Sequence, residues 1–200
     1  SGGTSYSWSP NIGLSSNTGT TVTATATPGY AILPVTGFNQ DIVANGVGAP
    51  STTTTANVDG GGYFFNDITF KLNAADAVPA YYLPTSGLIN SAATPGLSYQ
   101  LQSYSANNSV RLGNANVKKL AVTTPVSATD VYVLACSGGG AQTITATVHF
   151  TDGTTQVFTG INLQDWYNGG GFAIQGVGRC NASGFDATGG ATNPRLYDVR

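Results

Sequence analysis

The stretch Thr143-Ile144-Thr145-Ala146-Thr147-Val148-His149-Phe150 has an apolar residue at every even position and a polar residue at every odd one. Strict alternation with a period of two is typical of a β-strand that buries one face. The turn that follows is centred on Asp152-Gly153, a dipeptide favoured in tight hairpin turns, and Thr155-Gln156-Val157-Phe158 then continues as a second strand. The sequence therefore predicts a β-hairpin in this region.

The rest of the chain is also patterned as short strands separated by turn-forming residues, and no segment has the periodicity of a helix. The apolar run 131–136 predicts a central strand covered on both faces. Together these patterns predict an all-β fold, an antiparallel β-sandwich of the jelly-roll or immunoglobulin-like kind with long Gly/Thr/Asn-rich loops. Further strands are predicted at 20–25, 31–35, 56–65, 68–72, 98–102, 109–112, 117–123, 161–165, 172–176 and 196–199.

The composition is low in charge: charged residues make up 8% of the chain, against about 25% in an ordinary soluble domain. Glutamate is absent and the formal net charge is −2, so the chain lacks the excess positive charge that binding to nucleic acid or an anionic membrane requires, and neither is an expected partner. No apolar run approaches the roughly 20 residues of a membrane span. Solubility must come from Thr, Ser, Asn and Gln, which is typical of a secreted or cell-surface protein.

Residues 1–30 differ from the remainder. The segments Tyr6-Ser7-Trp8-Ser9-Pro10 and Gly13-Leu14-Ser15, followed by 20–27, resemble the closing part of a PKD-like repeat of large secreted bacterial proteins. Such a segment is either the end of a preceding domain or two strands packed onto the main sandwich, and the second is favoured because an isolated fragment would expose Trp8. Residues 31–200 are predicted to form the sandwich domain.

The segment Asp165-Trp166-Tyr167, followed by Gly178-Arg179 and Asn193-Pro194-Arg195-Leu196-Tyr197, resembles the end of galactose-binding-like carbohydrate-binding modules. The resemblance implies a jelly roll whose loops hold sugar or calcium.

Sugar recognition uses flat aromatic faces together with amide and guanidinium groups. Trp166 and Tyr167 precede the glycine-rich segment 168–171, and Arg179 and Arg195 are notable in a chain with so few charges. A second group of candidate ligand-binding residues consists of Tyr104, Asn108 and Arg111. The alternative is that Trp166 closes one end of the sandwich and that the arginines pair with Asp165 and Asp198.

The sequence gives little support for catalysis or for a specific metal site. The single histidine, His149, lies on the polar face of the predicted strand, and the chain has no G-x-S-x-G motif, so no enzyme activity and no cofactor are expected. A structural calcium ion could use Asp59 or Asp41, with Asp67, Asp165 and Asp186 as further candidates, although no D-x-D-x-D-G loop is present. Cys136 and Cys180 predict a disulfide in an extracellular protein, with two buried thiols as the alternative.

Two functions follow. The first is a non-catalytic carbohydrate-binding module whose partner is a polysaccharide or glycan. The alternative is a structural or adhesive domain, as in an adhesin, that assembles with neighbouring copies into a filament or stalk. The threonine run 51–55, predicted as a flexible loop or an edge strand, bears on the second, because an edge strand can pair with another chain.

Overall fold

The structure is a computed structural model that describes residues 7, 16, 18–23, 29–113 and 116–200. It divides into two units, Ser1–Tyr30 and Ala31–Arg200. Most of the segment predicted to resemble a PKD-like repeat lies outside the described residues. In the first unit, Ser7 and Thr18 form an antiparallel bridge.

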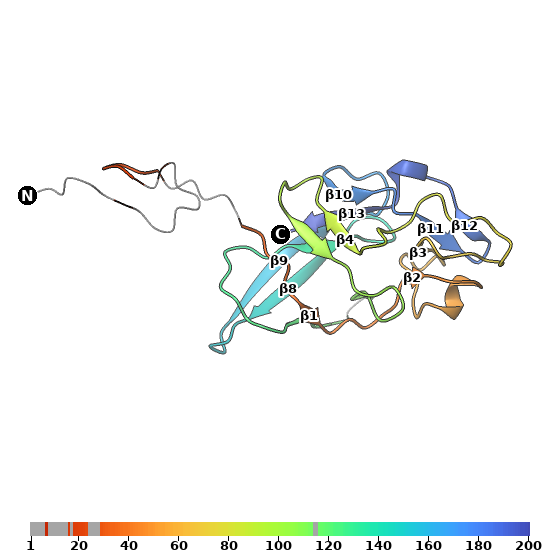
Figure 1. The fold of residues 1–200 in the computed structure, drawn as a ribbon. Helices are drawn as coiled ribbons and strands as arrows, with labels where there is room; N and C mark the ends of the chain where they lie inside the picture. Colours follow the sequence, from red (N-terminus) through yellow and green to blue (C-terminus); the bar gives the residue numbers. More distant parts are fainter. Residues whose placement is uncertain (1–6, 8–15, 17, 24–28, 114–115) are drawn as a thin grey trace, which may run out of the picture. The chain divides into compact units, whose positions relative to one another are not determined.

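The second unit is all-β (Figure 1). Its regular elements are strands and two short 3-10 turns, and no helix in the described part of the chain is long and apolar enough to cross a membrane. The strands are β1 (Val35–Thr36), β2 (Val43–Ala44), β3 (Phe64–Asn66), β4 (Leu88–Asn90), β5 (Ser98–Gln100), β6 (Ala121–Val122), β7 (Val133–Ala135), β8 (Gln142–His149), β9 (Thr155–Leu163), β10 (Phe172–Gln175), β11 (Arg179–Asn181), β12 (Gly184–Asp186) and β13 (Arg195–Val199). The 3-10 turns are η1 (Pro50–Thr52) and η2 (Gly190–Thr192).

These strands form a four-stranded sheet in the order β12-β11-β3-β2, a three-stranded sheet in the order β10-β13-β7, and the pairs β1-β6, β4-β5 and β8-β9. Every pairing is antiparallel except β2 with β3, which is parallel. The predicted all-β, mainly antiparallel class with long loops is therefore confirmed.

The predicted hairpin is confirmed as β8-β9, with His149 paired to Thr155 across the turn. The turn closes because the N–H of Phe150 donates to the carbonyl of Thr154 at 2.9 Å, while Gly153 adopts a φ of +85°. Alternate residues of β8 are half-buried, as the period of two predicts.

A main core lies between the sheets. It combines Val43 of β2, Phe65 of β3, Ile89 of β4 and Leu196 of β13, so both larger sheets and the β4-β5 pair pack on one apolar interior, as in a sandwich. The other members are Leu83, Trp166 and Val177.

The four-stranded sheet is covered on its opposite face as well. Ala44 and Phe64, the sequence neighbours of Val43 and Phe65, pack with Phe70 and Cys180 in a second cluster. Successive side chains of a strand point to opposite faces, so each of these dipeptides contributes to both clusters.

This alternation explains why the predicted disulfide is wrong. Cys180 of β11 is fully buried in the second cluster, whereas Cys136 packs against the main core, and both are free thiols. Burial raises the pKa of each thiol to about 12, and the charge of Asp165 adds to this effect at Cys136.

Two further predictions need correction. The run 131–136 does not form a central strand: β7 lies at the edge of its sheet, and Val133 is exposed there. The threonine run 51–55 is not an edge strand, since its first residues belong to η1 and its hydroxyls bond to nearby backbone, as in the 2.9 Å bond from Thr54 to the carbonyl of Pro50.

Candidate functional site

The candidate site is built around Arg179, the first residue of β11. In the antiparallel register Arg179 lies directly opposite Asp186 of β12, which places the two side chains on the same face of the sheet. The Nε and Nη2 atoms of Arg179 donate to the same carboxylate oxygen, Oδ2 of Asp186, at 2.8 and 2.7 Å. Each side chain is only 14% exposed, so solvent screens this ion pair much less than a surface pair.

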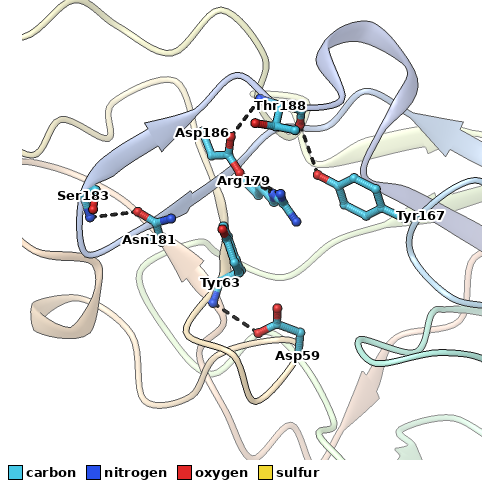
Figure 2. Close-up of polar contacts among 8 residues, drawn as sticks. All are labelled: Asp59, Tyr63, Tyr167, Arg179, Asn181, Ser183, Asp186 and Thr188. Atoms are coloured by element: carbon cyan, nitrogen blue, oxygen red, sulfur yellow. Dashed lines mark hydrogen bonds and ion pairs between the residues drawn. The ribbon is translucent and has the colours of Figure 1, made fainter.

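The guanidinium lies between tyrosine rings (Figure 2). Its central carbon is 4.0 Å from the ring centroid of Tyr63 and 4.5 Å from that of Tyr167. Both distances are within the range of favourable cation–π contacts. We refer to Tyr63, Tyr167, Arg179 and Asp186 as the arginine–tyrosine cluster.

Turns anchored by aspartates hold both rings. Oδ1 of Asp59 accepts hydrogen bonds from the N–H of Gly61 at 2.7 Å and of Tyr63 at 3.2 Å, which fixes the glycine-rich turn before β3. Oδ1 of Asp165 accepts the N–H of Tyr167 at 2.8 Å. The cluster is therefore positioned by backbone geometry as well as by contacts among its side chains.

The loop after β12 completes the support of Tyr167, whose hydroxyl donates to the carbonyl of Thr188 at 3.1 Å. Gly189 has a φ of +94°, and a Cβ at this position would lie 3.2 Å from the Tyr167 hydroxyl oxygen. Burial raises the pKa of Tyr167, and the nearby positive charge of Arg179 opposes this rise without cancelling it. The tyrosine therefore stays neutral at physiological pH.

Both oxygens of the Asp186 carboxylate have partners, since Oδ1 accepts the N–H of Thr188 at 2.8 Å. Burial raises the pKa of Asp186, but the hydrogen bonds from Thr188 and the interaction with Arg179 outweigh it, so the pKa is lower than usual. The arginine charge is thus balanced within the cluster.

The cluster still offers groups to a ligand. Within the described residues, neither the Tyr63 hydroxyl nor Nη1 of Arg179 makes a hydrogen bond to the protein. Tyr63, Tyr167 and Arg179 are all partly exposed. The arrangement can therefore present aromatic surface, one hydroxyl and one guanidinium nitrogen in fixed positions.

Trp166, predicted as a sugar-stacking residue, lies in the core instead. It is 3% exposed, and its ring packs edge-on against Phe65 at 5.5 Å and against Tyr167 at 5.7 Å. The alternative interpretation of Trp166 as a core plug is the better description. It supports Tyr167 and the guanidinium of Arg179, which is 5.7 Å from its ring.

Arg195, also predicted to bind ligand, holds two loops together. Its Nε donates to the carbonyl of Thr192 at 2.7 Å, its Nη1 donates to the carbonyl of Gly169, and its guanidinium lies 5.1 Å from the ring of Phe172. The alternative pairing of the arginines with Asp165 and Asp198 is wrong, because Arg179 pairs with Asp186 and Arg195 bonds to backbone carbonyls.

The second predicted group joins separate chain segments. The hydroxyl of Tyr104 donates to the carbonyl of Pro84 at 2.6 Å. Nδ2 of Asn108 donates to Asp41 at 2.6 Å, and Nη2 of Arg111 reaches Asn57 at 3.4 Å. These bonds assign Asn108 and Arg111 to the framework, while Tyr104 also lines a cavity.

The aspartates considered for calcium are engaged in turns. Oδ1 of Asp41 accepts the N–H of Val43 at 3.1 Å in addition to the Asn108 amide, and Asp59 organises its own turn. Burial raises the pKa of Asp41, against the lowering effect of these bonds. Within the described ranges, no three His, Cys, Asp or Glu side chains gather in a metal-binding group. His149 is exposed on β8.

The sequence analysis named Tyr167 and Arg179 as ligand-binding candidates but missed Tyr63, and it named Asp186 only as a candidate calcium ligand and not as the partner of Arg179. A signal existed for both. Tyr63 follows the glycine tract 60–62, much as Tyr167 adjoins 168–171, and the turn residues of 181–184 predict a hairpin that pairs Arg179 with Asp186.

The structure thus defines an all-β module with an arginine held between tyrosines at the start of β11, an inner strand of the four-stranded sheet. Comparisons of the chain with protein families, with curated proteins and with solved structures found no match. The resemblances to galactose-binding-like modules and to PKD-like repeats remain predictions.

Proposed function

We propose that residues 31–200 form a non-catalytic glycan-binding module of a secreted or cell-surface protein, with Tyr63, Tyr167 and Arg179 as its ligand-contacting residues. The observation that carries this proposal is the placement of the Arg179 guanidinium 4.0 and 4.5 Å from the centroids of two partly exposed tyrosine rings. Aromatic surface beside a planar, multidonor cation is the combination that sugar recognition requires.

The rigidity of the cluster supports the same proposal. A ligand that binds mobile side chains must offset about 0.5–1.5 kcal/mol for each one it immobilises. Here Asp186 fixes Arg179, Asp59 fixes the turn of Tyr63, and Thr188 fixes the Tyr167 hydroxyl. The binding surface is therefore already ordered before a weakly binding ligand such as a sugar arrives.

A glycan array tests the proposal with wild-type protein, Tyr63→Ala and Tyr63→Phe. We expect wild-type binding to at least one glycan, near-complete loss in Tyr63→Ala, and a smaller loss in Tyr63→Phe, which keeps the ring but lacks the free hydroxyl. Tyr132→Ala is the matched control, because Tyr132 is half-buried and has no ring contact with the Arg179 guanidinium. Absence of wild-type binding to every glycan, or binding by Tyr63→Ala equal to wild type, would contradict the proposal.

A second candidate function, assembly into a filament or stalk, is favoured by the exposed apolar residues of the β8-β9 hairpin and of residues 117–131, which include β6 and precede β7. Val117 is 94% exposed and Val157 58% exposed. Phe150, Phe158, Val126 and Val131 are also exposed. Large exposed apolar surfaces are typical of protein–protein contacts.

Sedimentation of the intact chain over a wide concentration range separates the two candidates. Assembly predicts concentration-dependent association that the double variant Val157→Thr/Phe158→Thr weakens. A monomer at every concentration would contradict assembly and would leave the glycan-binding proposal unaffected.

A further inference from the structure

A cavity of about 400 Å³ lies apart from the arginine–tyrosine cluster, between the end of β3 and the residues that flank β4 and β5. Its lining includes Asp67, Ser86, Gln100, Gln102 and Tyr104, and it shares no residue with the cluster. The volume falls within the range of small-molecule binding sites.

Asp67 and Gln100 of this cavity are held in place by hydrogen bonds and present acceptor oxygens, whereas the hydroxyls of Thr85, Ser86, Ser103 and Ser105, which also line it, can both donate and accept. Oδ1 of Asp67 accepts the N–H and the hydroxyl of Thr69 at 2.8 and 2.7 Å. Nε2 of Gln100 donates to the carbonyls of Ser86 and Leu101 at 3.0 and 3.3 Å. Within the described chain, Oδ2 of Asp67 and Oε1 of Gln100 accept no hydrogen bond from the protein.

Tyr104 adds a third oxygen of the same kind. Its hydroxyl hydrogen is directed at the carbonyl of Pro84 at 2.6 Å, so only its lone pairs remain for a ligand. Burial raises the pKa of Tyr104 to about 12, with the negative charge of Asp67 adding to the effect. The phenol therefore stays protonated.

A pocket with fixed, unpaired acceptors and a carboxylate selects ligands that donate hydrogen bonds and disfavours anions. Hydroxyl groups on adjacent carbons of a sugar ring are such donors. The exposed amide of Gln102, which makes no hydrogen bond to other described residues, offers both a donor and an acceptor at the rim.

A second cavity of about 280 Å³ shares Gln100 and Gln102 with the first and is otherwise lined by Ile32, Leu33, Pro34 and Val35. The two cavities therefore adjoin at Gln100 and Gln102, and we refer to them together as the groove, with a polar and an apolar part. The apolar part can pack against the C–H face of a sugar unit next to the one held in the polar part.

We infer that this groove is a second glycan-binding site, which takes a neutral, hydroxyl-rich sugar unit in its polar part and a neighbouring unit in its apolar part. The inference concerns residues outside the arginine–tyrosine cluster and does not depend on that cluster binding sugar.

Backbone amide chemical shifts of the full ¹⁵N-labelled chain provide the test, with methyl glucoside, methyl galactoside and methyl mannoside as probes and methyl galacturonide as the anionic comparison. Ligand is added to about 50 mM, because ligands of this size have little surface with which to bind. We expect amides of residues 100–105 to shift with at least one neutral hexoside, weaker shifts with the uronide, and tighter binding of the corresponding disaccharide.

Gln102→Ala is the principal variant, since Gln102 makes no hydrogen bond within the described structure that its removal would break. We expect about three- to tenfold weaker binding, the value of one hydrogen bond between neutral groups. Gln156→Ala, at an exposed position of β9, is the matched control and should bind like wild type. Asp67→Asn, which keeps the oxygen that caps Thr69, should bind the uronide better than wild type does.

Three outcomes would overturn the inference: no shifts at 100–105 with any hexoside, equal shifts with the uronide, or unchanged affinity in Gln102→Ala. Because shifts at residues 63, 167 and 179 report on the arginine–tyrosine cluster separately, either site can fail in this experiment while the other stands.

Discussion

Replacing Arg179 by alanine tests whether a largely buried ion pair, stacked between two tyrosines, stabilises the fold by joining β11 to β12 and to the turns that carry these tyrosines. The variant removes two charged hydrogen bonds of 2.8 and 2.7 Å, an interaction worth about 1.5–3 kcal/mol. It also removes ring contacts at 4.0 and 4.5 Å, worth about 0.5–1 kcal/mol each.

Some of this loss is recovered, because Asp186 is 14% exposed and water will solvate the carboxylate once the arginine is gone. We therefore expect a net decrease of about 3 kcal/mol in the free energy of unfolding, which for a chain of this size lowers the Tm by about 6–12 °C. Urea unfolding followed by Trp166 fluorescence measures this decrease in the free energy of unfolding. Trp8→Phe is the background, since it removes the other tryptophan of the chain.

The chain contains its own control. Arg200 and Asp130 form an ion pair with similar distances, Nη2–Oδ1 2.5 Å and Nε–Oδ1 2.6 Å, but their side chains are 66% and 35% exposed. Arg200→Ala should cost less than about 0.5 kcal/mol, since exposed pairs contribute little. Equal destabilisation by the two alanine variants, or a loss below about 1 kcal/mol for Arg179→Ala, would refute the reasoning from burial.

Three further predictions concern the framework. Gly60 and Gly178 have nearly the same φ, +73° and +72°, but an added Cβ meets nothing within 4 Å at Gly60 and overlaps the backbone carbonyl oxygen of Tyr81 at Gly178. Alanine should therefore cost about 1–2 kcal/mol at Gly60 and about 3 kcal/mol or more at Gly178 in urea unfolding, and similar costs would contradict the steric overlap at Gly178. Burial raises the pKa of the partly buried Cys136 and the fully buried Cys180 to about 12, so a thiol reagent at pH 8 should react slowly with both in the folded protein and more slowly with Cys180, and rapid reaction of Cys180 before unfolding would contradict its burial. The folded-state pKa of Asp186 is lowered from 3.8, so the stabilisation that its carboxylate gives the folded protein is present above that pH and is lost as the pH falls further. On acidification, followed by circular dichroism, Asp186→Asn should therefore lose less stability than the wild-type protein loses.

Local pattern was sufficient for the β8-β9 hairpin, because eight alternating residues and an Asp-Gly turn specify it without help from the rest of the chain. Strands β2, β4, β11 and β12 were not predicted. Each is two or three residues long, too short to show a period of two in the sequence. β2 and β11 are paired with β3, which is distant from them in the sequence, whereas β4 and β12 pair with their sequence neighbours β5 and β11. For β2 and β11, pairing with a distant strand, rather than local propensity, forms the strand.

The error at Trp166 has a specific cause. The glycines that follow it indicated an exposed loop, but a Cβ at Gly169 would lie 2.5 Å from the hydroxyl of Tyr197, a core residue. Gly169 therefore permits close packing against the core instead of marking a mobile surface segment. Sequence alone does not separate these two uses of glycine.

The placement of charge connects the two proposed sites. Three of the four arginines have guanidinium groups that contact other parts of the protein. Arg179 is stacked between tyrosines and Arg195 joins two loops. Arg111 has a buried Nε without a partner in the described structure. With the charge of Arg179 already balanced by Asp186, the arginine–tyrosine cluster has no excess positive charge to attract an anion. The groove beside Asp67 is acceptor-rich and disfavours anions as well. Both proposed sites would therefore select ligands by shape and by hydrogen bonds, which is the chemistry that neutral sugars offer.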